Sequence, residues 1–381
     1  MLIGIDGNEA NVSNRVGSNV YAYEILKYLH GVAKIGNDVR FRVYLKDSWQ
    51  TLLPTKQKNW QYSVFGPKLL WTQWRLPVKL FSEKLKKSAP SLFFTPGHYA
   101  PRFSPVPTVI TIMDLAYLKF PNEFKKKDLR QLTSWTAYSI KKARHILTIS
   151  ESTKKDIIET YGVNPDNITV TYPGISRSLK TEKDNSYQHL SAYLGIIKPY
   201  ILYIGTLQPR KNLERLIEAF ANLKKDSQNR MLKLVVVGKK GWLYQSIFTK
   251  VKELKVLGEV IFTGFVSDYE KFELLRYAEV FVLPSLYEGF GIPVLEAMTA
   301  GVPVLASKVS SLPEVGGDAI SYISNPESVV EIEKKLSEVL QLSEDKKLEI
   351  INKQKRQAQK FSWERCGEKT LDVLLNVSKN I

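Results

Sequence analysis

Two glutamates, Glu288 and Glu296, give the strongest chemical signal in the sequence. Seven residues separate them, and the stretch that contains them, Leu283–Gly301, runs from an apolar strand through a glycine-containing turn into a helix. A carboxylate accepts two hydroxyl hydrogen bonds at once, so such residues suit the vicinal diols of a ribose and a hexose. The stretch alone is equally compatible with two acids that only cap the turn and complement the helix dipole.

The same turn predicts an anion site. Pro293 stands where the first turn of a helix accepts a residue without an N–H, so we expect the helix to begin close to Gly291. Unoccupied backbone amides over residues 291–295 would then point beyond the carboxyl edge of the sheet, where helix N-termini bind phosphate groups.

Two adjacent cations follow another predicted strand. Arg210 and Lys211 lie in the loop Gly205–Asn212, between a strand over Tyr200–Ile204 and a helix over Leu213–Leu223. Arginine offers a planar fork and lysine a point charge, and together they would neutralise a diphosphate and stabilise it as a leaving group. A solvated basic loop is the alternative interpretation.

A weaker candidate is Gly17, in the stretch Asn8–Tyr23 that leads into the first helix. A glycine at the first crossover from strand to helix lets the backbone approach a ligand closely. Many crossovers carry such a glycine for packing alone.

Short apolar runs alternate with longer helical patterns along the whole chain, which is typical of parallel sheets covered by helices. Several runs are almost wholly apolar, as strands buried on both faces should be. The predicted strands form a first series over 2–6, 39–45, 91–95, 108–112, 146–150 and 168–172, and a second over 200–204, 232–237, 260–263, 280–283 and 302–306.

A polar stretch, Pro173–Pro199, separates the two series and lacks clear periodicity. We therefore predict an N-terminal α/β domain over residues 1–174, a linker over 175–198 and a C-terminal α/β domain over 199–360. Residues 361–381 have a helical pattern with no strand after it, and they are predicted to form a final helix.

Taken in this order, the stretches resemble the retaining glycosyltransferases of family 4. Glu288-Gly-Phe-Gly-Ile-Pro-Val-Leu-Glu296 matches that family's signature of two glutamates, Gly205–Asn212 is similar to its phosphate loop, and Gly264–Asp268 is similar to its nucleobase loop. Ser307–Gly317 also fits, and the resemblance covers nearly the whole chain. It implies the GT-B fold, in which two Rossmann-like domains face each other across a cleft. The first domain would bind the acceptor and the second the nucleotide sugar, and the final helix would cross back to the first.

The resemblance also implies a role for each site residue. Glu296 would bind the ribose hydroxyls, Glu288 the transferred sugar, and Lys211 with Arg210 the diphosphate. The remaining implied donor contacts are the amides of Phe290 and Gly291 toward the sugar or β-phosphate, the amides of Val294 and Leu295 toward the α-phosphate, Val266 in the nucleobase loop, and Gly17 from the opposite domain.

Two positions depart from the family pattern. Thr206 stands where many members have arginine, which leaves the cationic clamp to Arg210 and Lys211. Met113 stands where histidine is common, and a thioether neither hydrogen-bonds strongly to a hydroxyl nor passes a proton. Asp114 is therefore the predicted polar contact to the reacting sugar or acceptor. His98, in a neighbouring loop, either compensates for Met113 or is structural.

The implied reaction transfers a hexosyl group with retention of anomeric configuration. Bond breaking leaves positive charge on the sugar and negative charge on the diphosphate, which helix-start amides and the two cations would stabilise. No Asp-x-Asp cluster suited to a divalent ion is visible, so we predict no metal and no cofactor. The phosphate loop looks most like that of mannosyltransferases and favours GDP-mannose as the donor, while UDP-glucose and UDP-N-acetylglucosamine stay open.

The charge is concentrated in the front half of the chain. The 55 Lys and Arg residues exceed the 38 Asp and Glu residues by 17, and residues 1–200, with 29 basic and 15 acidic side chains, account for +14. Such a field favours an anionic partner.

The stretch Lys68–Ser88 combines tryptophan, leucine and phenylalanine with lysines, as an interfacial helix would. A core-facing helix with a solvated basic side is the alternative. The charge favours an acidic membrane surface that carries a lipid-linked acceptor, and the acceptor is expected to be a glycan or a lipid-linked molecule.

A single cysteine, Cys366, excludes a disulfide framework and a thiolate zinc site and fits a reducing cytosol. No signal-peptide pattern or apolar run of about 18 residues is visible, so we expect a cytoplasmic protein at the inner face of the cell membrane.

Two other functional classes stay open. A nucleic-acid-binding protein would explain the charge, although no aromatic-basic recognition motif is visible. A GT-B protein that binds nucleotides without catalysis would explain Met113.

Overall fold

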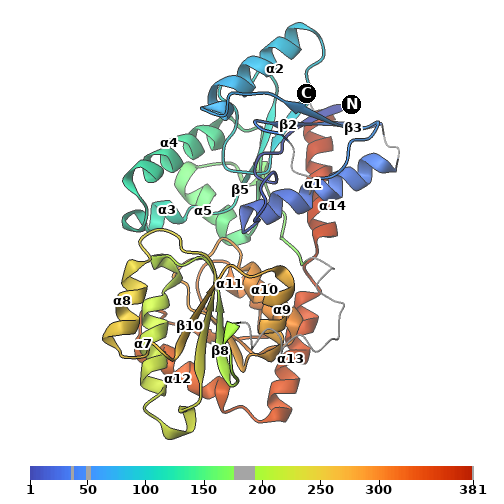
Figure 1. Cartoon of the computed structure of the whole chain (residues 1–381). Coiled ribbons are helices and arrows are strands. Elements are labelled where there is room, and N and C mark those ends of the chain that lie inside the picture. Colours follow the sequence, from blue (N-terminus) through green and yellow to red (C-terminus); the bar gives the residue numbers. More distant parts are fainter. Residues whose placement is uncertain (36–37, 49–52, 176–193, 380–381) are drawn as a thin grey trace. The chain divides into compact units, whose positions relative to one another are not determined.

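The computed structural model describes residues 1–35, 38–48, 53–175 and 194–379. The chain divides into two compact units (Figure 1). The N-terminal unit comprises Met1–Leu118, Lys126–Gly174 and Ser362–Ile381, and the C-terminal unit comprises Lys119–Lys125 and Ile175–Phe361. Most of the predicted linker, residues 175–198, lies outside the described residues.

The N-terminal unit is built on a parallel seven-stranded sheet with the order β3-β2-β1-β4-β5-β6-β7. Successive strands run outward from β1 to β3 and then from β4 to β7, so the order reverses between β1 and β4, as in doubly wound folds. The strands are β1 (Leu2–Asp6), β2 (Arg40–Leu45), β3 (Trp60–Val64), β4 (Leu92–Thr95), β5 (Thr108–Ile112), β6 (His145–Thr148) and β7 (Ile168–Val170).

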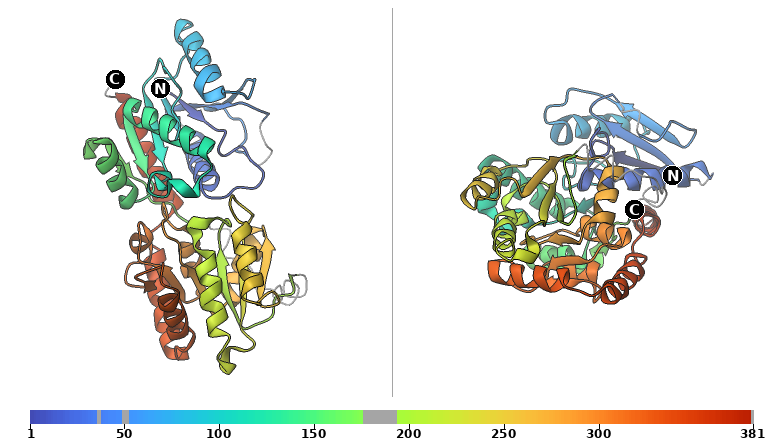
Figure 2. Two further views of the ribbon diagram at one scale, coloured as in Figure 1. Left: turned by 90° about the vertical axis from the view of Figure 1, so that its left-hand side faces the viewer. Right: turned by 60° about the horizontal axis from the view of Figure 1, so that its bottom comes forward.

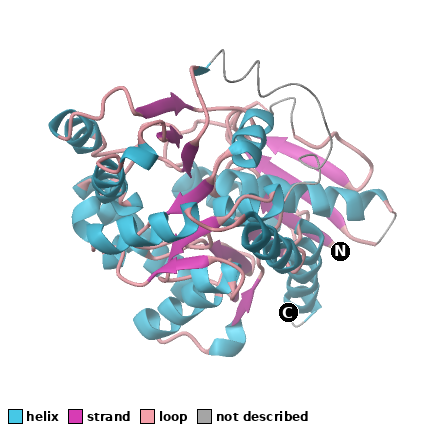
Figure 3. Cartoon of the chain, turned by 90° about the horizontal axis from the view of Figure 1, so that it is seen from below, coloured by secondary structure: helices cyan, strands magenta, loops and turns pink. Residues whose placement is uncertain are grey.

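Helices flank this sheet (Figures 1 and 3). The final helix, α14 (Trp363–Lys379), packs beside α1 (Ser18–Lys34), and α4 (Lys126–Lys142) packs beside α5 (Glu151–Tyr161). Two shorter helices, α2 (Leu76–Leu85) and α3 (Ala116–Lys119), complete the unit, and a π-helical turn over Trp71–Arg75 leads into α2.

The C-terminal unit contains a parallel six-stranded sheet with the order β10-β9-β8-β11-β12-β13. Its strands are β8 (Tyr200–Ile204), β9 (Lys233–Val237), β10 (Val260–Gly264), β11 (Val280–Leu283), β12 (Val304–Ser307) and β13 (Ser321–Ile323). The central strands β8, β11 and β12 are buried along their whole length, which explains their apolar sequences.

Two layers of helices cover the second sheet (Figure 1 and the left-hand view of Figure 2). One layer contains α7 (Leu213–Leu223), α8 (Gln245–Glu253) and α12 (Val329–Leu340). The other contains α9 (Asp268–Tyr277), α10 (Ile292–Ala300), α11 (Leu312–Gly316) and α13 (Glu344–Ala358). Within the described residues, no helix combines the length and the apolar character that crossing a membrane requires.

The predicted α/β class, with two parallel sheets and a C-terminal helix, is confirmed. Two strands were not predicted, β3 and β13, and both are outermost in their sheets and only partly buried. The predicted N-terminal domain, residues 1–174, also contains one segment, Lys119–Lys125, that groups with the C-terminal unit instead.

The contact between α1 and α14 can be tested with a matched pair of substitutions. A methyl group on Gly367 of α14 would lie 2.2 Å from Cγ of Tyr28, whereas one on Gly31 of α1 would meet nothing within 4 Å. Alanine is about 1 kcal/mol more favourable than glycine inside a helix, so Gly31→Ala should raise the free energy of unfolding by up to that amount. Gly367→Ala should lower it by about 1–3 kcal/mol because the helices must separate. Urea denaturation measures both, and stabilisation by both variants would contradict the packing.

Candidate functional site

The topology of the C-terminal sheet fixes where its functional residues meet. Strands β8 and β11 are parallel neighbours, and the strand order reverses between them. In open parallel sheets, ligands bind beyond the carboxyl ends of the strands at such a reversal. The loop with Arg210 and Lys211 leaves β8 at this edge, and the turn with Glu288 leaves β11 beside it.

The loop after β8 is tied directly to the turn after β11. Pro209–Lys211 forms one 3-10 turn, which ends at Asn212 in the left-handed region with φ 60°. The side-chain amide of Asn212 donates to the carbonyl oxygens of Pro284, at 3.0 Å, and Pro326, at 2.6 Å. The amide of Leu286 also donates to the carbonyl of Arg210 at 2.9 Å. These bonds set the position of the two cations relative to Glu288.

Glu288 is buried, with 8% of its surface exposed, and it is surrounded by donors. Lys211 Nζ lies 2.5 Å from Oε1, Ser285 Oγ donates to the same oxygen at 2.7 Å, and Arg210 Nη1 lies 3.9 Å from Oε2. Burial alone would raise the pKa of Glu288, but the charges of Lys211 and Arg210 outweigh it and lower that pKa. The site therefore holds an ionised carboxylate between two cations.

Arg210 is itself buried, and one of its donors has no acceptor. Its Nη1 donates to the carbonyl of Tyr287, while Nε is buried without a hydrogen-bond partner among the described residues. A guanidinium has five N–H donors in a fixed fork, so this arrangement leaves capacity for an anion.

The turn after β11 is held from the side of β12. Ser310 Oγ accepts from the amide of Glu288 at 2.8 Å, and Ser311 Oγ lies 2.9 Å from the carbonyl oxygen of Glu288 and 3.0 Å from that of Phe290. The ring of Phe290 also packs edge-on against Phe361, with 5.6 Å between centroids. Two serines that the sequence analysis did not single out therefore fix the backbone of the turn.

Helix α10 begins as expected, but it presents fewer amides than expected. Gly291 caps it with φ 105°, and a Cβ there would lie 2.7 Å from Leu312 Cδ2, so the position requires glycine. The amides of Val294 and Leu295 donate to the carbonyl of Gly291 at 2.9 and 3.3 Å, and Pro293 has no N–H. The expectation of unoccupied amides throughout 291–295 is therefore wrong for Val294 and Leu295. Among the described residues, the amides of Gly291 and Ile292 are the remaining candidate donors at this helix start.

Glu296 forms a second ion pair that the sequence analysis missed. Lys271 Nζ lies 2.6 Å from Glu296 Oε1 and 2.9 Å from Asp268 Oδ1, and both the lysine and Glu296 are largely buried. Burial would lower the pKa of Lys271, but the charges of Glu296 and Asp268 outweigh it and raise that pKa. The capping box of Ser267 and Glu270, a recognisable sequence signal, starts α9 and so places Lys271 one turn into the helix.

The loop predicted to contact the nucleobase lies at the end of β10. Gly264 has φ 75°, Val266 is buried and Phe265 is half exposed. The amide of Gly238, after β9, donates to the carbonyl of Gly264 at 2.8 Å, and a Cβ on Gly238 would lie 2.0 Å from the carbonyl oxygen of Gly205. Close backbone packing thus joins the loops after β8, β9 and β10.

The N-terminal unit carries the other predicted residues. Gly17 is the N-cap of α1 with φ 53°, and a Cβ there would meet nothing within 4 Å. Asp114 follows β5, and its Oδ1 accepts at 3.0 Å from the amide of Ala116, the first residue of α3. The backbone of Gly17 thus has a conformation that favours glycine, and the space beside its Cα is open. Both features are compatible with a ligand that approaches the backbone here.

His98 and Met113 lie at the same sheet edge as Asp114. Met113 is buried, and its carbonyl accepts from Thr153 Oγ1 at 3.2 Å. His98 follows β4, and its Nδ1 is buried without a partner among the described residues. Burial lowers the pKa of His98, while the charges of Asp114 and Glu9 act in the opposite direction. His98 is thus close enough to Asp114 for the charge of Asp114 to affect the pKa of His98. The polar groups that Met113 supplies are those of its backbone.

The segment Lys119–Lys125 adds side chains to the C-terminal unit. Phe120 packs against Tyr287 with 6.3 Å between ring centroids, and Phe124 packs against Trp242 at 5.5 Å. Burial raises the pKa of Glu123, and the charges of Arg210 and Arg215 partly offset that effect. This segment therefore brings an acid close to the cationic loop, a feature that no local sequence pattern indicates.

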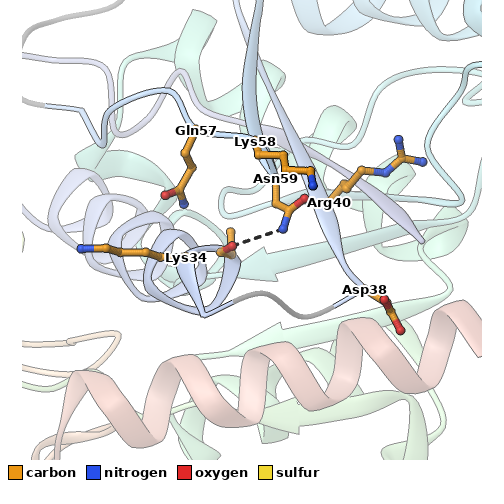
Figure 4. Close-up of a pocket in the computed structure, with 7 residues that line it drawn as sticks. Lys34, Asp38, Arg40, Gln57, Lys58 and Asn59 are labelled. Carbon is orange, nitrogen blue, oxygen red and sulfur yellow. Dashed lines mark hydrogen bonds between the residues drawn. The ribbon is translucent and has the colours of Figure 1, made fainter.

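One surface cavity, of about 510 Å³, lies away from these residues (Figure 4). Its lining residues include Lys34, Arg40 and Asn59, and Asn59 Nδ2 donates to the carbonyl of Ala33 at 3.4 Å. Because β2 and β3 begin here, the cavity is at the amino ends of the strands. None of the predicted site residues lines it.

Comparison with known proteins identifies the class. A model of glycosyl transferases group 1 matches residues 196–358, and a model of Glycosyltransferase Family 4 matches residues 17–179. The chain is 33% identical over 267 residues to O-antigen chain mannosyltransferase B of Escherichia coli, which covers 70% of this chain and 69% of that protein. The chain belongs to the family 4 glycosyltransferases and is a glycosyltransferase.

Further relatives agree with this family, and solved structures agree with the fold. The chain is 29% identical to the serotype-specific mannosyltransferase WbdA of Escherichia coli over 65% of its own length, but it spans only 30% of that protein. The structure is similar to WaaG, a glycosyltransferase involved in lipopolysaccharide biosynthesis, with a TM-score of 0.73, 21% identity and coverage of 98% and 99% of the two chains. It is also similar to Anabaena HepE in complex with UDP-glucose, with a TM-score of 0.74, 18% identity and coverage of 98% and 99%. These likenesses confirm the predicted GT-B fold.

The ion pair between Lys211 and Glu288 makes a prediction about stability. Lys211→Met removes one of the two cations that offset the burial of Glu288, so it should lower the free energy of unfolding at about pH 7 by roughly 1–3 kcal/mol. Because the folded-state pKa of Glu288 is lowered, the pair stabilises the fold above the usual carboxylate pKa and stops doing so as the pH falls through the lowered value. The difference between variant and wild type should therefore shrink in acid.

Urea denaturation at neutral and acid pH measures this difference. Lys353→Met is the matched control, because Lys353 pairs with Glu349 at 2.8 Å on the exposed side of α13 and should matter little. Equal effects of the two substitutions would contradict the assigned role of Lys211.

Proposed function

We propose that this chain is a retaining hexosyltransferase that moves mannose from GDP-mannose to a glycan or lipid-linked acceptor without a metal ion. The observation that carries the proposal is the buried group of Arg210, Lys211 and Glu288 at the strand-order reversal of the C-terminal sheet. The names of the relatives support mannose, because O-antigen chain mannosyltransferase B and WbdA are both mannosyltransferases.

The two cations supply the electrostatic part of the mechanism. As the bond between the anomeric carbon and the phosphate oxygen breaks, its electron pair leaves with the diphosphate and the sugar becomes cation-like. Lys211 and the unpartnered Nε of Arg210 would stabilise the negative charge that grows on the diphosphate. Glu288, between them, would accept hydroxyl hydrogen bonds from the sugar and hold it in place.

The acceptor completes the reaction on the same face of the sugar. Its hydroxyl oxygen forms the new bond to the anomeric carbon from the side that the diphosphate leaves, so the configuration is retained. The hydroxyl proton passes to the departing phosphate oxygen, which makes a protein base unnecessary. Asp114 is the proposed polar contact to the reacting sugar or acceptor, with His98 at the same sheet edge as a second polar group.

The rest of the donor site is assigned by the same proposal. Glu296 would bind the ribose hydroxyls, and Val266 would lie beside the nucleobase. The backbone at Phe290 and Gly291 would face the sugar or β-phosphate, and the first turn of α10 at Val294 and Leu295 would lie near the α-phosphate through its dipole, since both amides are already bonded. Gly17 would let the N-terminal backbone approach the diphosphate.

Metal independence rests on the positive charge that the chain itself supplies. Two cations at the phosphate position perform the neutralisation that a divalent ion performs in other transferases. Transfer should therefore persist in the presence of a chelator.

We further propose that the acceptor is presented at an acidic membrane surface, at the cytoplasmic face, and that nucleic acid is not a partner. The excess of 14 positive charges in residues 1–200 supports this assignment. A transferase that has lost catalysis is the second candidate, and the buried Met113 in place of a histidine favours it. Nucleotide binding without transfer would select that candidate.

Donor choice and residue roles are tested together. Thermal denaturation with GDP-mannose, UDP-glucose and UDP-N-acetylglucosamine should show the largest stabilisation by GDP-mannose. Glu296→Ala should weaken GDP and UDP alike by about tenfold or more, because the ribose is common to both. Glu288→Ala should lower kcat of transfer by about 10²–10³ with a smaller effect on nucleotide affinity.

The control for both variants is Glu349→Ala, which removes an exposed carboxylate of α13. Calorimetric titration of the nucleotides and a transfer assay with radiolabelled sugar give the two readouts. Full activity and affinity in both site variants would refute the assignment.

A further inference from the structure

Helix α2 and the π-helical turn before it have apolar side chains on two opposite sides. On the inner side, Trp71, Leu76 and Leu80 pack against Tyr44 and Phe93 of the N-terminal sheet. The outer side chains are large, apolar and exposed to solvent, and they are Leu69, Leu70, Trp74, Val78, Phe81 and Leu85. We call these six residues the outer apolar surface.

Four residues of the outer apolar surface lie on one face of the π-helical turn and α2. Trp74, Val78, Phe81 and Leu85 follow one another at intervals of four, three and four residues, so they share one face. Trp74 is 66% exposed and Leu85 86% exposed. Figures 1 and 2 show α2 at the edge of the N-terminal unit. Single exposed apolar side chains are common on proteins, but a row of them along one helix marks a contact surface.

The exposed charges of this segment are cations, one of which, Lys68, pairs with Asp47 of a neighbouring loop. Residues 68–88 contain six Lys or Arg and one acid, Glu83. Glu83 points into the unit, where Tyr44 donates to its Oε2 and Arg42 and Lys79 lie 3.1 and 3.3 Å away. The acid is thus buried and compensated, and the exposed ionic groups of the segment are cations, with Lys86 and Lys87 at the C-terminal end of α2.

We propose that the outer apolar surface of α2 inserts into an anionic lipid membrane, with Trp74 and Phe81 at the level of the headgroups and Lys86 and Lys87 paired with lipid phosphates. This insertion rests on the proposed function, in which the acceptor is presented at an acidic membrane surface. Tryptophan favours the membrane interface, and each lysine near an anionic leaflet contributes to binding. Charge complementarity selects this partner over a second copy of the chain, because a two-fold contact would bring two sets of cations together.

Co-sedimentation with vesicles tests the proposal. The full chain should bind vesicles that contain phosphatidylglycerol and phosphatidylcholine and bind weakly to phosphatidylcholine alone. The double variant Trp74→Ser/Phe81→Ser should partition at least about tenfold less. Lys86→Gln/Lys87→Gln should lose about tenfold on the anionic vesicles and little on the neutral ones, and added salt should reduce this difference.

The matched control is Val330→Ser/Leu348→Ser, which removes two exposed apolar side chains from α12 and α13 of the C-terminal unit. All variants should keep the wild-type nucleotide affinity, so failure here is distinct from failure of the proposed transferase function. Equal partitioning of the wild type and the Trp74→Ser/Phe81→Ser variant would overturn the proposal. So would a dimer in analytical ultracentrifugation that this double variant abolishes.

A second inference rests on the buried pair of Lys271 and Glu296. Lys271 reaches across from α9 to α10 and also contacts Asp268, so its ammonium group is held at two points. Glu296 Oε1, at 2.6 Å from Nζ, is therefore fixed in direction. We infer that Lys271 is a positioning residue that orients Glu296 for the two ribose hydroxyls, and this inference rests on the proposed role of Glu296.

The ribose hydroxyls themselves supply the test. Wild type should prefer GDP over 2′,3′-dideoxy-GDP, and Lys271→Met should reduce that preference by about fivefold or more, because Glu296 loses its orientation. Lys271→Arg should restore part of that preference, and Lys271→Met should raise KM for the donor by a larger factor than it lowers kcat. UDP and 2′,3′-dideoxy-UDP serve as the same pair of probes if UDP-sugars stabilise the chain better.

Each outcome separates the possible roles. If Lys271 acted on the phosphates instead, both nucleotides would weaken equally and the preference would be unchanged, which would overturn the inference. If Glu296→Ala removes the preference while Lys271→Met does not, only this inference fails. If neither variant changes it, the proposed ribose contact of Glu296 fails as well.

Discussion

A buried carboxylate must be compensated, and the site in the C-terminal unit is organised around that requirement. An uncompensated Glu288 would protonate or destabilise the fold, since removing a charge from water costs several kcal/mol. Lys211, Arg210 and Ser285 supply the compensation from the two neighbouring loops. The carboxylate therefore joins the loops after β8 and β11, and the strand-order reversal between these strands is what brings the loops together.

The same constraint connects stability to the proposed chemistry. The cations that keep Glu288 ionised without a donor are those that would neutralise a diphosphate when a donor binds. An entering diphosphate would compete for Lys211 and Arg210, and sugar hydroxyls would take their place as donors to Glu288. Glu296 and Lys271 form a comparable pair one helix away, where the ribose is proposed to bind. At Glu288 the ligand would replace an internal partner, whereas at Glu296 the lysine would stay in place and orient the carboxylate. Both carboxylates would thus be compensated before and after binding.

Most of the fold could be predicted from the sequence because the central strands are apolar on both faces. The glycine and proline residues of the turns also indicate where strands end and helices begin. The edge strands β3 and β13 were not predicted because each has a partly solvated face and therefore no apolar run.

Arg210, Lys211 and Glu288 were predicted from the turns that contain them. Their mutual distances depend on the pairing of β8 with β11, which joins residues far apart in the sequence and cannot be predicted from a local pattern. Lys271 lies 25 residues from Glu296 and was missed for the same reason. The amides of Val294 and Leu295 donate to the carbonyl of Gly291 because that residue caps the start of the helix. This backbone geometry cannot be deduced from the residue types alone.

We propose that Arg210 and Lys211 exchange Glu288 for a diphosphate when the donor binds. A crystal structure of the chain with GDP-mannose tests it most directly. We expect phosphate oxygens within hydrogen-bond distance of Arg210 Nε and Lys211 Nζ, with sugar hydroxyls on Glu288 in place of the lysine. A donor bound elsewhere, with the contact between Lys211 and Glu288 intact, would contradict it.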